Sequence, residues 1–155
     1  MTYPSRLCAA IGLALFATTG WAQHAGQHHY VAAKDLKWAA VPSLPAGAQI
    51  TVLEGPMNQA APFTVRLKFP AGYRIPPHTH PAVERVTVLS GTFHMGMGEK
   101  FDPKAAQAVR AGELMIMQPG TAHYAWAEGE TVVQLHGMGP WGITYINPAD
   151  DPRKR

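Results

Sequence analysis

The sequence predicts an all-β fold, an antiparallel β-sandwich or barrel, on three observations. Short β-branched or alternating runs recur from Gln49 onward, as in half-buried strands. Turn dipeptides separate these runs, among them Ser90-Gly91, Pro119-Gly120 and Glu128-Gly129. One segment alone carries a helix signal. Regularly spaced short strands with turns between them are typical of sandwiches and barrels.

The candidate strands follow one another closely along the chain. They are Gln49 to Leu53, Phe63 to Phe69, Tyr73 to Ile75 with an extension towards His80, Arg85 to Leu89, Thr92 to Met97, Glu113 to Met117, His123 to Ala127, Thr131 to His136 and Gly142 to Ile146. A short helix is predicted at Pro103 to Ala108, with Asp102 as its N-cap and Pro103 at its first position.

The N-terminus has the pattern of a secretory signal peptide. A positive start at Met1 to Arg6 precedes the apolar stretch Leu7 to Thr19, and small residues around Ala22 suit a signal peptidase. We therefore expect a signal peptide over residues 1–22 and an exported protein, periplasmic or secreted. The apolar stretch is too short to span a membrane. The single cysteine, Cys8, falls within the signal peptide, so the mature chain offers no thiolate ligand.

The mature chain suits one domain with one core. We expect an irregular N-terminal segment at 23–48, the β-domain at 49–147 and a solvated C-terminal tail at 148–155. The chain has 13 Lys and Arg against 10 Asp and Glu, but three of the basic residues end the chain at Arg153, Lys154 and Arg155. Because the body is close to neutral, nucleic acid is not an expected partner.

The stretch P-P-H-T-H-P-A-V-E places three metal-binding side chain types close together. His78 and His80 share one face of an extended chain, because successive side chains alternate. Glu84 has the same parity, but on a straight strand it would lie roughly 20 Å from His78 at about 3.3 Å per residue. The chain must therefore turn back, and Pro81 stands where that turn is needed.

Two motifs in this region resemble those of the cupin superfamily. Gly72-X5-His78-X-His80-X3-Glu84-X6-Gly91 matches the first cupin motif, and Gly112-X7-Gly120-X2-His123 is similar to the second. In the second motif Gln118 stands where the family usually has Pro, and Ala127 replaces the usual Asn. The resemblance, which covers residues 72–127, implies a jelly-roll barrel in which His78, His80, Glu84 and His123 hold one metal ion.

The ligand chemistry points to a divalent transition metal. Three neutral imidazoles and one carboxylate carry a net charge of about minus one and suit Mn, Fe, Co, Ni, Cu or Zn better than Mg or Ca. Since loading is expected outside the cytoplasm, the affinity order favours copper, with zinc next and manganese or iron where availability decides.

The expected function is a mononuclear oxidoreductase that uses dioxygen or peroxide on a small organic or carbohydrate substrate, copper-dependent oxidation of a polysaccharide included. A non-catalytic metal-binding or ligand-binding cupin is the alternative, and a Lewis-acid isomerase or hydrolase is the third reading. His94 and His136 are candidates for supporting the ligands or polarising a substrate. The sequence leaves the oligomeric state open, and a homodimer is one option because cupins commonly dimerise.

Overall fold

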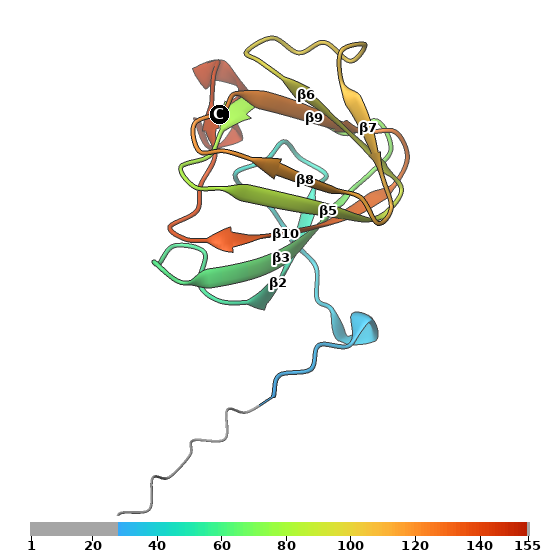
Figure 1. The fold of residues 1–155 in the computed structure, drawn as a ribbon, viewed down its shortest axis with the longest axis vertical. Coiled ribbons are helices and arrows are strands. Elements are labelled where there is room, and N and C mark those ends of the chain that lie inside the picture. Colours follow the sequence, from blue (N-terminus) through green and yellow to red (C-terminus); the bar gives the residue numbers. More distant parts are fainter. Residues whose placement is uncertain (1–27, 155) are drawn as a thin grey trace, which may run out of the picture. The chain divides into compact units, whose positions relative to one another are not determined.

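Two antiparallel β-sheets lie face to face in this computed structural model, which describes residues 28–154 (Figure 1). Residues from Val31 onward form one compact unit. Its strands are β1 (Ala39–Ala40), β2 (Gln49–Glu54), β3 (Pro62–Phe69), β4 (Arg74–Thr79), β5 (Glu84–Ser90), β6 (Thr92–Met97), β7 (Gln107–Arg110), β8 (Leu114–Met117), β9 (His123–Ala127), β10 (Thr131–Met138) and β11 (Thr144–Tyr145). One sheet has the order β1-β2-β3-β10-β5-β8 and the other the order β11-β4-β9-β6-β7.

This arrangement confirms the predicted all-β jelly roll, and each predicted strand has a counterpart. The predicted helix at Pro103 to Ala108 is wrong. The segment forms a turn in which the Asp102 carboxylate accepts a hydrogen bond from the Lys104 amide at 2.9 Å, and the Tyr124 hydroxyl donates to the Asp102 carbonyl at 2.8 Å. An Asp side chain that binds the backbone two residues on favours a turn as readily as a helix start.

The core between the sheets consists of the inward-facing residues of both. Val65, Phe69, Val88 and Val133 come from the six-stranded sheet and are at most 1% exposed. The Phe69 ring stacks on the Phe93 ring of the opposite sheet with centroids 5.3 Å apart. Burying one such side chain stabilises the fold by about 1.5–3 kcal/mol, so the paired sheets fix the site built between them.

Gly91 carries the chain from one sheet to the other. It follows β5 of the six-stranded sheet and precedes β6 of the five-stranded sheet, with a φ of 79°. A Cβ atom there would lie 2.5 Å from the Glu130 carbonyl oxygen. Both the positive φ and the close backbone approach require glycine, which explains why the first motif ends on this residue.

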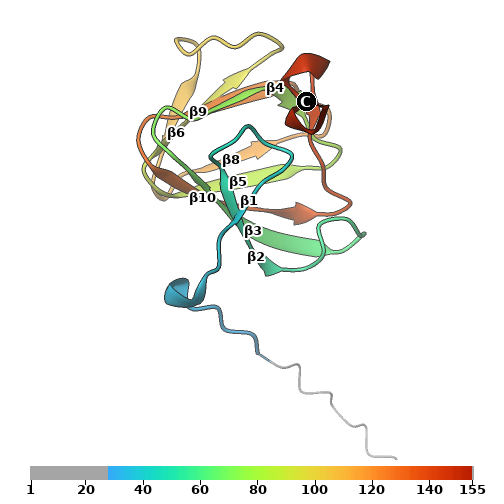
Figure 2. The ribbon, with the colours of Figure 1, turned by 180° about the vertical axis from the view of Figure 1, so that it is seen from behind.

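The segments on either side of the predicted domain also pack against it. Leu44 and Ala48 belong to the core, although residues 23–48 were expected to be irregular. At the other end, two 3-10 turns, Pro148–Asp150 and Pro152–Lys154, lie beside β4 (Figure 2). In the predicted tail, Asp151 is buried and Arg153 donates a hydrogen bond to the Ile143 carbonyl, whereas Pro148, Ala149 and Lys154 are exposed. The signal peptide predicted at 1–22 lies outside the described residues.

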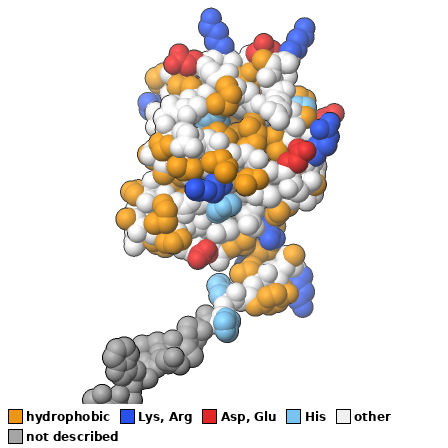
Figure 3. All heavy atoms as spheres, in the orientation of Figure 1, with side chains coloured by type: hydrophobic (Ala, Val, Ile, Leu, Met, Phe, Trp, Pro, Cys, Tyr) orange, Lys and Arg blue, Asp and Glu red, His pale blue; other side chains and the backbone are white. Residues whose placement is uncertain are grey.

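Charged side chains are scattered over the face shown in Figure 3, with Lys and Arg interspersed among acidic and apolar groups. Within the described part of the chain, none of the helices has the length and apolar character needed to cross a membrane.

Candidate metal centre

Three strands bring the predicted ligands together. His78 lies in β4 and is the register partner of His123, the first residue of the neighbouring β9. His80 follows the end of β4, and Glu84 is the first residue of β5 in the opposite sheet. The turn at residues 81–83 therefore reverses the chain, as the sequence predicted, and places Glu84 across from the histidines.

The side chains form a tight and buried group. One ring nitrogen from each of His78, His80 and His123 lies within 4.8 Å of the other two. All three histidines and Glu84 are at most 8% exposed. Three imidazoles at this separation can share one ion, so these residues could hold a metal.

Each histidine is oriented by a backbone carbonyl. The Nδ1 atoms of His78, His80 and His123 lie 2.7, 2.7 and 2.9 Å from the carbonyl oxygens of Pro76, Gly142 and Thr121. A carbonyl can only accept, so Nδ1 carries the proton and Nε2 presents its lone pair. Metal-ligating histidines in proteins are typically fixed in this way through the nitrogen that does not bind the metal.

The Glu84 carboxylate lies between two of these lone pairs. Its Oε1 is 3.4 Å from His80 Nε2, and its Oε2 is 3.1 Å from His123 Nε2. Among the described residues, neither His80 Nε2 nor Glu84 Oε2 has a hydrogen-bond partner. Buried acceptors that face one another are unfavourable unless a cation or a proton joins them. The three histidines could thus hold a metal ion, with the Glu84 carboxylate facing two of them.

In the absence of a metal ion, burial and neighbouring charges shift the pKa values of the three histidines in different directions. Burial, followed by the neighbouring His123 and His80, holds the pKa of His78 well below its ordinary value. Burial also lowers the pKa of His80, despite the opposing charge of Glu84. At His123 burial again favours the neutral ring, but the adjacent Glu84 carboxylate outweighs it and raises the pKa. A proton between His123 and Glu84 can therefore occupy the position of a cation.

The structure does not bring His94 or His136 to this group. Each alternates along its strand with core residues and lies on the outer face of its sheet. The His94 ring stacks on Trp126 at 3.7 Å, and its Nε2 lies 3.3 Å from the Glu128 carboxylate.

Contacts that the sequence did not predict lie next to His80. The Trp141 ring stacks on the His80 ring with centroids 4.3 Å apart, and Gly142 supplies the carbonyl described above. The Arg153 guanidinium donates to the Ile143 carbonyl at 3.0 Å. No motif spacing signals these contacts, because they join segments 10 to 62 residues apart in the chain.

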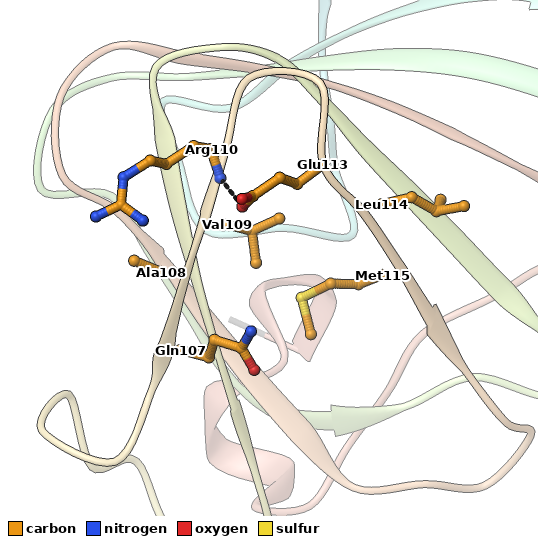
Figure 4. Close-up of a pocket in the computed structure, with 7 residues that line it drawn as sticks. All are labelled: Gln107, Ala108, Val109, Arg110, Glu113, Leu114 and Met115. Atoms are coloured by element: carbon orange, nitrogen blue, oxygen red, sulfur yellow. Dashed lines mark hydrogen bonds between the residues drawn. The ribbon is translucent and has the colours of Figure 1, made fainter.

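A cavity of about 360 Å³ opens onto the candidate metal group, and His78, His80 and Glu84 form part of its wall. A second void of about 30 Å³ is lined by core residues together with His78, Glu84 and His123. Figure 4 shows another depression, of about 710 Å³, at the turn that joins β7 to β8, where Arg110 and Glu113 lie close together. Its lining includes none of the candidate ligands, so the 360 Å³ cavity is the candidate substrate site.

The jelly roll of two antiparallel sheets, with three histidines and a glutamate gathered between them, is that of a cupin. More specifically, the chain belongs to the family of the ChrR cupin-like domain, whose model matches residues 26–141.

Known proteins with similar sequences include Germin-like protein 5-1 of Oryza sativa subsp. japonica, which is 31% identical over 90 residues. That match covers 57% of this chain and 40% of the relative, so the chain corresponds to less than half of the germin-like protein.

Solved structures share the fold at low sequence identity. A candidate acetylacetone dioxygenase of Methylibium petroleiphilum PM1 matches with a TM-score of 0.62 and 16% identity, over 81% of this chain and 85% of its own. The anti-sigma ChrR of Rhodobacter sphaeroides, in complex with SigE, matches with a TM-score of 0.52 and 20% identity, over 68% and 50%. At these identities the likeness shows the fold alone.

Proposed function

We propose that this protein is an exported, metal-dependent oxidoreductase that acts on a small organic molecule with dioxygen or peroxide. The observation that carries the proposal is the convergence of three Nε2 lone pairs and one carboxylate on a buried point beside a cavity. The groups lining that cavity include no Ser-His-Asp arrangement, so a bound metal is the group best suited to supply redox chemistry.

The protein's own part is to hold the ion and exclude water. His78, His80, His123 and Glu84 would bind it, and the three backbone carbonyls would keep the rings in the ligating tautomer. An ion held by four protein ligands would be able to take up further ligands, such as substrate or oxygen, from the adjoining cavity. Copper remains the favoured metal, because binding outside the cytoplasm would follow the affinity order.

The similar proteins support two functional interpretations, an oxygen-using enzyme and a non-catalytic binding module. A candidate dioxygenase among proteins of the same fold supports an oxygen-using enzyme. The family description and the ChrR complex support a non-catalytic module that binds metal or a small ligand and acts on a protein partner. Oxygen consumption separates the two readings, because only the enzyme turns over.

The test uses the full chain, expressed with its N-terminus and recovered from outside the cytoplasm. Elemental analysis and electron paramagnetic resonance should find about one redox-active metal per chain. Oxygen and peroxide consumption is then measured with the copper, manganese, iron and zinc forms over organic acids, phenols and oligosaccharides. If no form exceeds free metal while a small ligand still binds at the site, the binding module replaces the enzyme.

The proposed export is tested on the same protein, recovered from outside the cytoplasm. Mass spectrometry should show a mature chain beginning at Gln23, without a covalent lipid. A recovered chain that retains Met1, or a lipid on Cys8, would contradict the signal-peptide interpretation.

A further inference from the structure

We infer that the ligand of this cavity is a compact amphiphilic monoanion: an apolar body with a single acidic oxygen that reaches the metal. This inference rests on one part of the proposed function, namely that the site binds a metal ion. It narrows the substrate class and excludes carbohydrate.

The size of the cavity sets the size of the ligand. A volume of about 360 Å³ corresponds to about twelve water molecules at their share of the liquid, so a ligand of about ten non-hydrogen atoms fits. Polysaccharide chains, which extend over several rings, would have to be bound from outside this space.

The wall of the cavity is apolar away from the candidate ligands. Side chains such as Ile50, Met57, Leu67, Leu135 and Ile143 form most of it. Ligand pockets typically combine such walls with a few polar groups that fix orientation. Here the candidate metal ligands His78, His80 and Glu84 form the largest group of polar side chains in the wall, so we place the polar end of a ligand there.

The remaining polar side chains of the wall are few, namely Ser43, Trp141 and Arg153, and the guanidinium of Arg153 is partly engaged. The Ser43 carbonyl accepts a hydrogen bond from the Tyr145 hydroxyl at 2.8 Å. The Arg153 guanidinium makes two hydrogen bonds to the Asp151 carboxylate and one to the Ile143 carbonyl. A sugar buried here would leave several hydroxyls without partners, each at a cost of about 1–3 kcal/mol.

The net charge of the metal-loaded site favours an anionic ligand over a neutral one. Three neutral imidazoles, one carboxylate and a divalent ion sum to plus one, at a site where Glu84 is 5% exposed. A charge of this kind is costly in an apolar surrounding unless an opposite charge neutralises it. One anionic oxygen at an open coordination position would do so, whereas a neutral ligand would not.

The experiment compares three probes on the metal-loaded full chain by isothermal titration calorimetry. The probes are 4-methylbenzoate, its methyl ester, and glucuronate as a polar monoanion. We expect 4-methylbenzoate to bind at least tenfold more tightly than either of the others, and to lose this affinity when the metal is removed. Glucuronate binding of equal strength, or ester binding as tight as the acid, would overturn the inference.

A matched pair of variants tests the apolar wall. Met57→Gln keeps the side chain length but places an amide in the wall, and should weaken 4-methylbenzoate binding by at least threefold. Met138→Gln makes the same change at an exposed position outside the cavity and should have no effect. Equal affinities in the two variants would contradict the assignment of the cavity.

The outcomes separate this inference from the proposed function. Selective binding of 4-methylbenzoate without any oxygen consumption refutes the oxidoreductase and leaves the ligand class standing. Oxygen consumption with carbohydrate, but not with amphiphilic acids, refutes the ligand class and leaves the oxidoreductase standing. A chain that retains no metal refutes both.

Discussion

His80 Nδ1 donates a hydrogen bond to the Gly142 carbonyl at 2.7 Å, which joins the candidate metal site to the C-terminal part of the chain. Next to Gly142, the Ile143 carbonyl accepts from Arg153, whose guanidinium is held by Asp151. The C-terminal turns thus hold the segment that orients His80.

Arg153→Gln should therefore weaken metal binding without unfolding the protein. Loss of a partner that directly orients a ligand costs about 10–100-fold in metal affinity, and Arg153 acts one step further away, so we expect about threefold to tenfold. The measurement is a competition titration with a chromogenic chelator, beside urea unfolding. Lys154→Gln, at the exposed neighbour, is the matched control. Equal metal affinities for the two variants would show that the C-terminal turns do not support the site.

His80→Ala and His123→Ala should each abolish stoichiometric metal binding. Each change removes one of the converging Nε2 donors and leaves the others in place. Elemental analysis after gel filtration checks the result, with His94→Ala as the control because His94 lies on the outer face of its sheet. If His80→Ala and His123→Ala keep one metal with an unchanged spectrum, the ligand assignment is wrong.

Much of the fold could be predicted from the chain because strand periodicity and turn residues are local signals. Thr92–Met97 and His123–Ala127 match their predicted bounds. The four-residue strand β7 was missed because Asp102 and Pro103 imitate a helix start, whereas the Asp102 carboxylate in fact closes a turn. Short-range signals of equal strength can favour different structures, and packing then decides between them.

The candidate site, like the fold, could be predicted from sequence only where the signals are local. Alternation and motif spacing predicted one site for His78, His80, Glu84 and His123, and the structure places these side chains near one another. The same alternation, applied with the strand bounds known, would have turned His136 away from the cavity, since the adjacent Leu135 is part of its wall. Contacts such as Arg153 to Ile143 depend on how the C-terminal turns pack, and no sequence period encodes that packing.

Acid should destabilise the metal-free protein below pH 6.5. The lowered pKa values of His78 and His80 mean that the unfolded chain takes up protons there while the folded chain resists them. His123, whose pKa is raised, is protonated in both states below pH 6.5, so it does not offset this loss. The folded state therefore binds up to two protons fewer, and stability falls by about 1.4 kcal/mol per pH unit for each.

Urea unfolding of the metal-free chain between pH 6.5 and 5.5 measures this slope, below the pH range in which the raised pKa of His123 contributes with the opposite sign. His78→Gln removes one of the two groups and should make the dependence shallower. A slope of zero in the wild type, or the same slope in His78→Gln, would contradict the interpretation of the buried histidines.

Glu84→Gln tests the role of the carboxylate as a charge. The amide has nearly the same shape as the carboxylate, so the fold should persist, while the group that faces His80 and His123 becomes neutral. Loss of the negative charge disfavours the higher oxidation state of a bound metal, and the reduction potential should rise. Because a proton between Glu84 and His123 is no longer favoured, the pKa of His123 should fall in the metal-free variant.

Redox titration of the metal-loaded variant and NMR titration of the His123 ring in the metal-free variant measure these two effects separately. Glu99→Gln, an exposed carboxylate in the turn after β6, provides the control for a general change in net charge. The His123 pKa should fall only in Glu84→Gln, because only Glu84 lies against that ring. A potential and a His123 pKa that move equally in both variants would mean that Glu84 acts through the overall charge of the protein and not as a group at the metal.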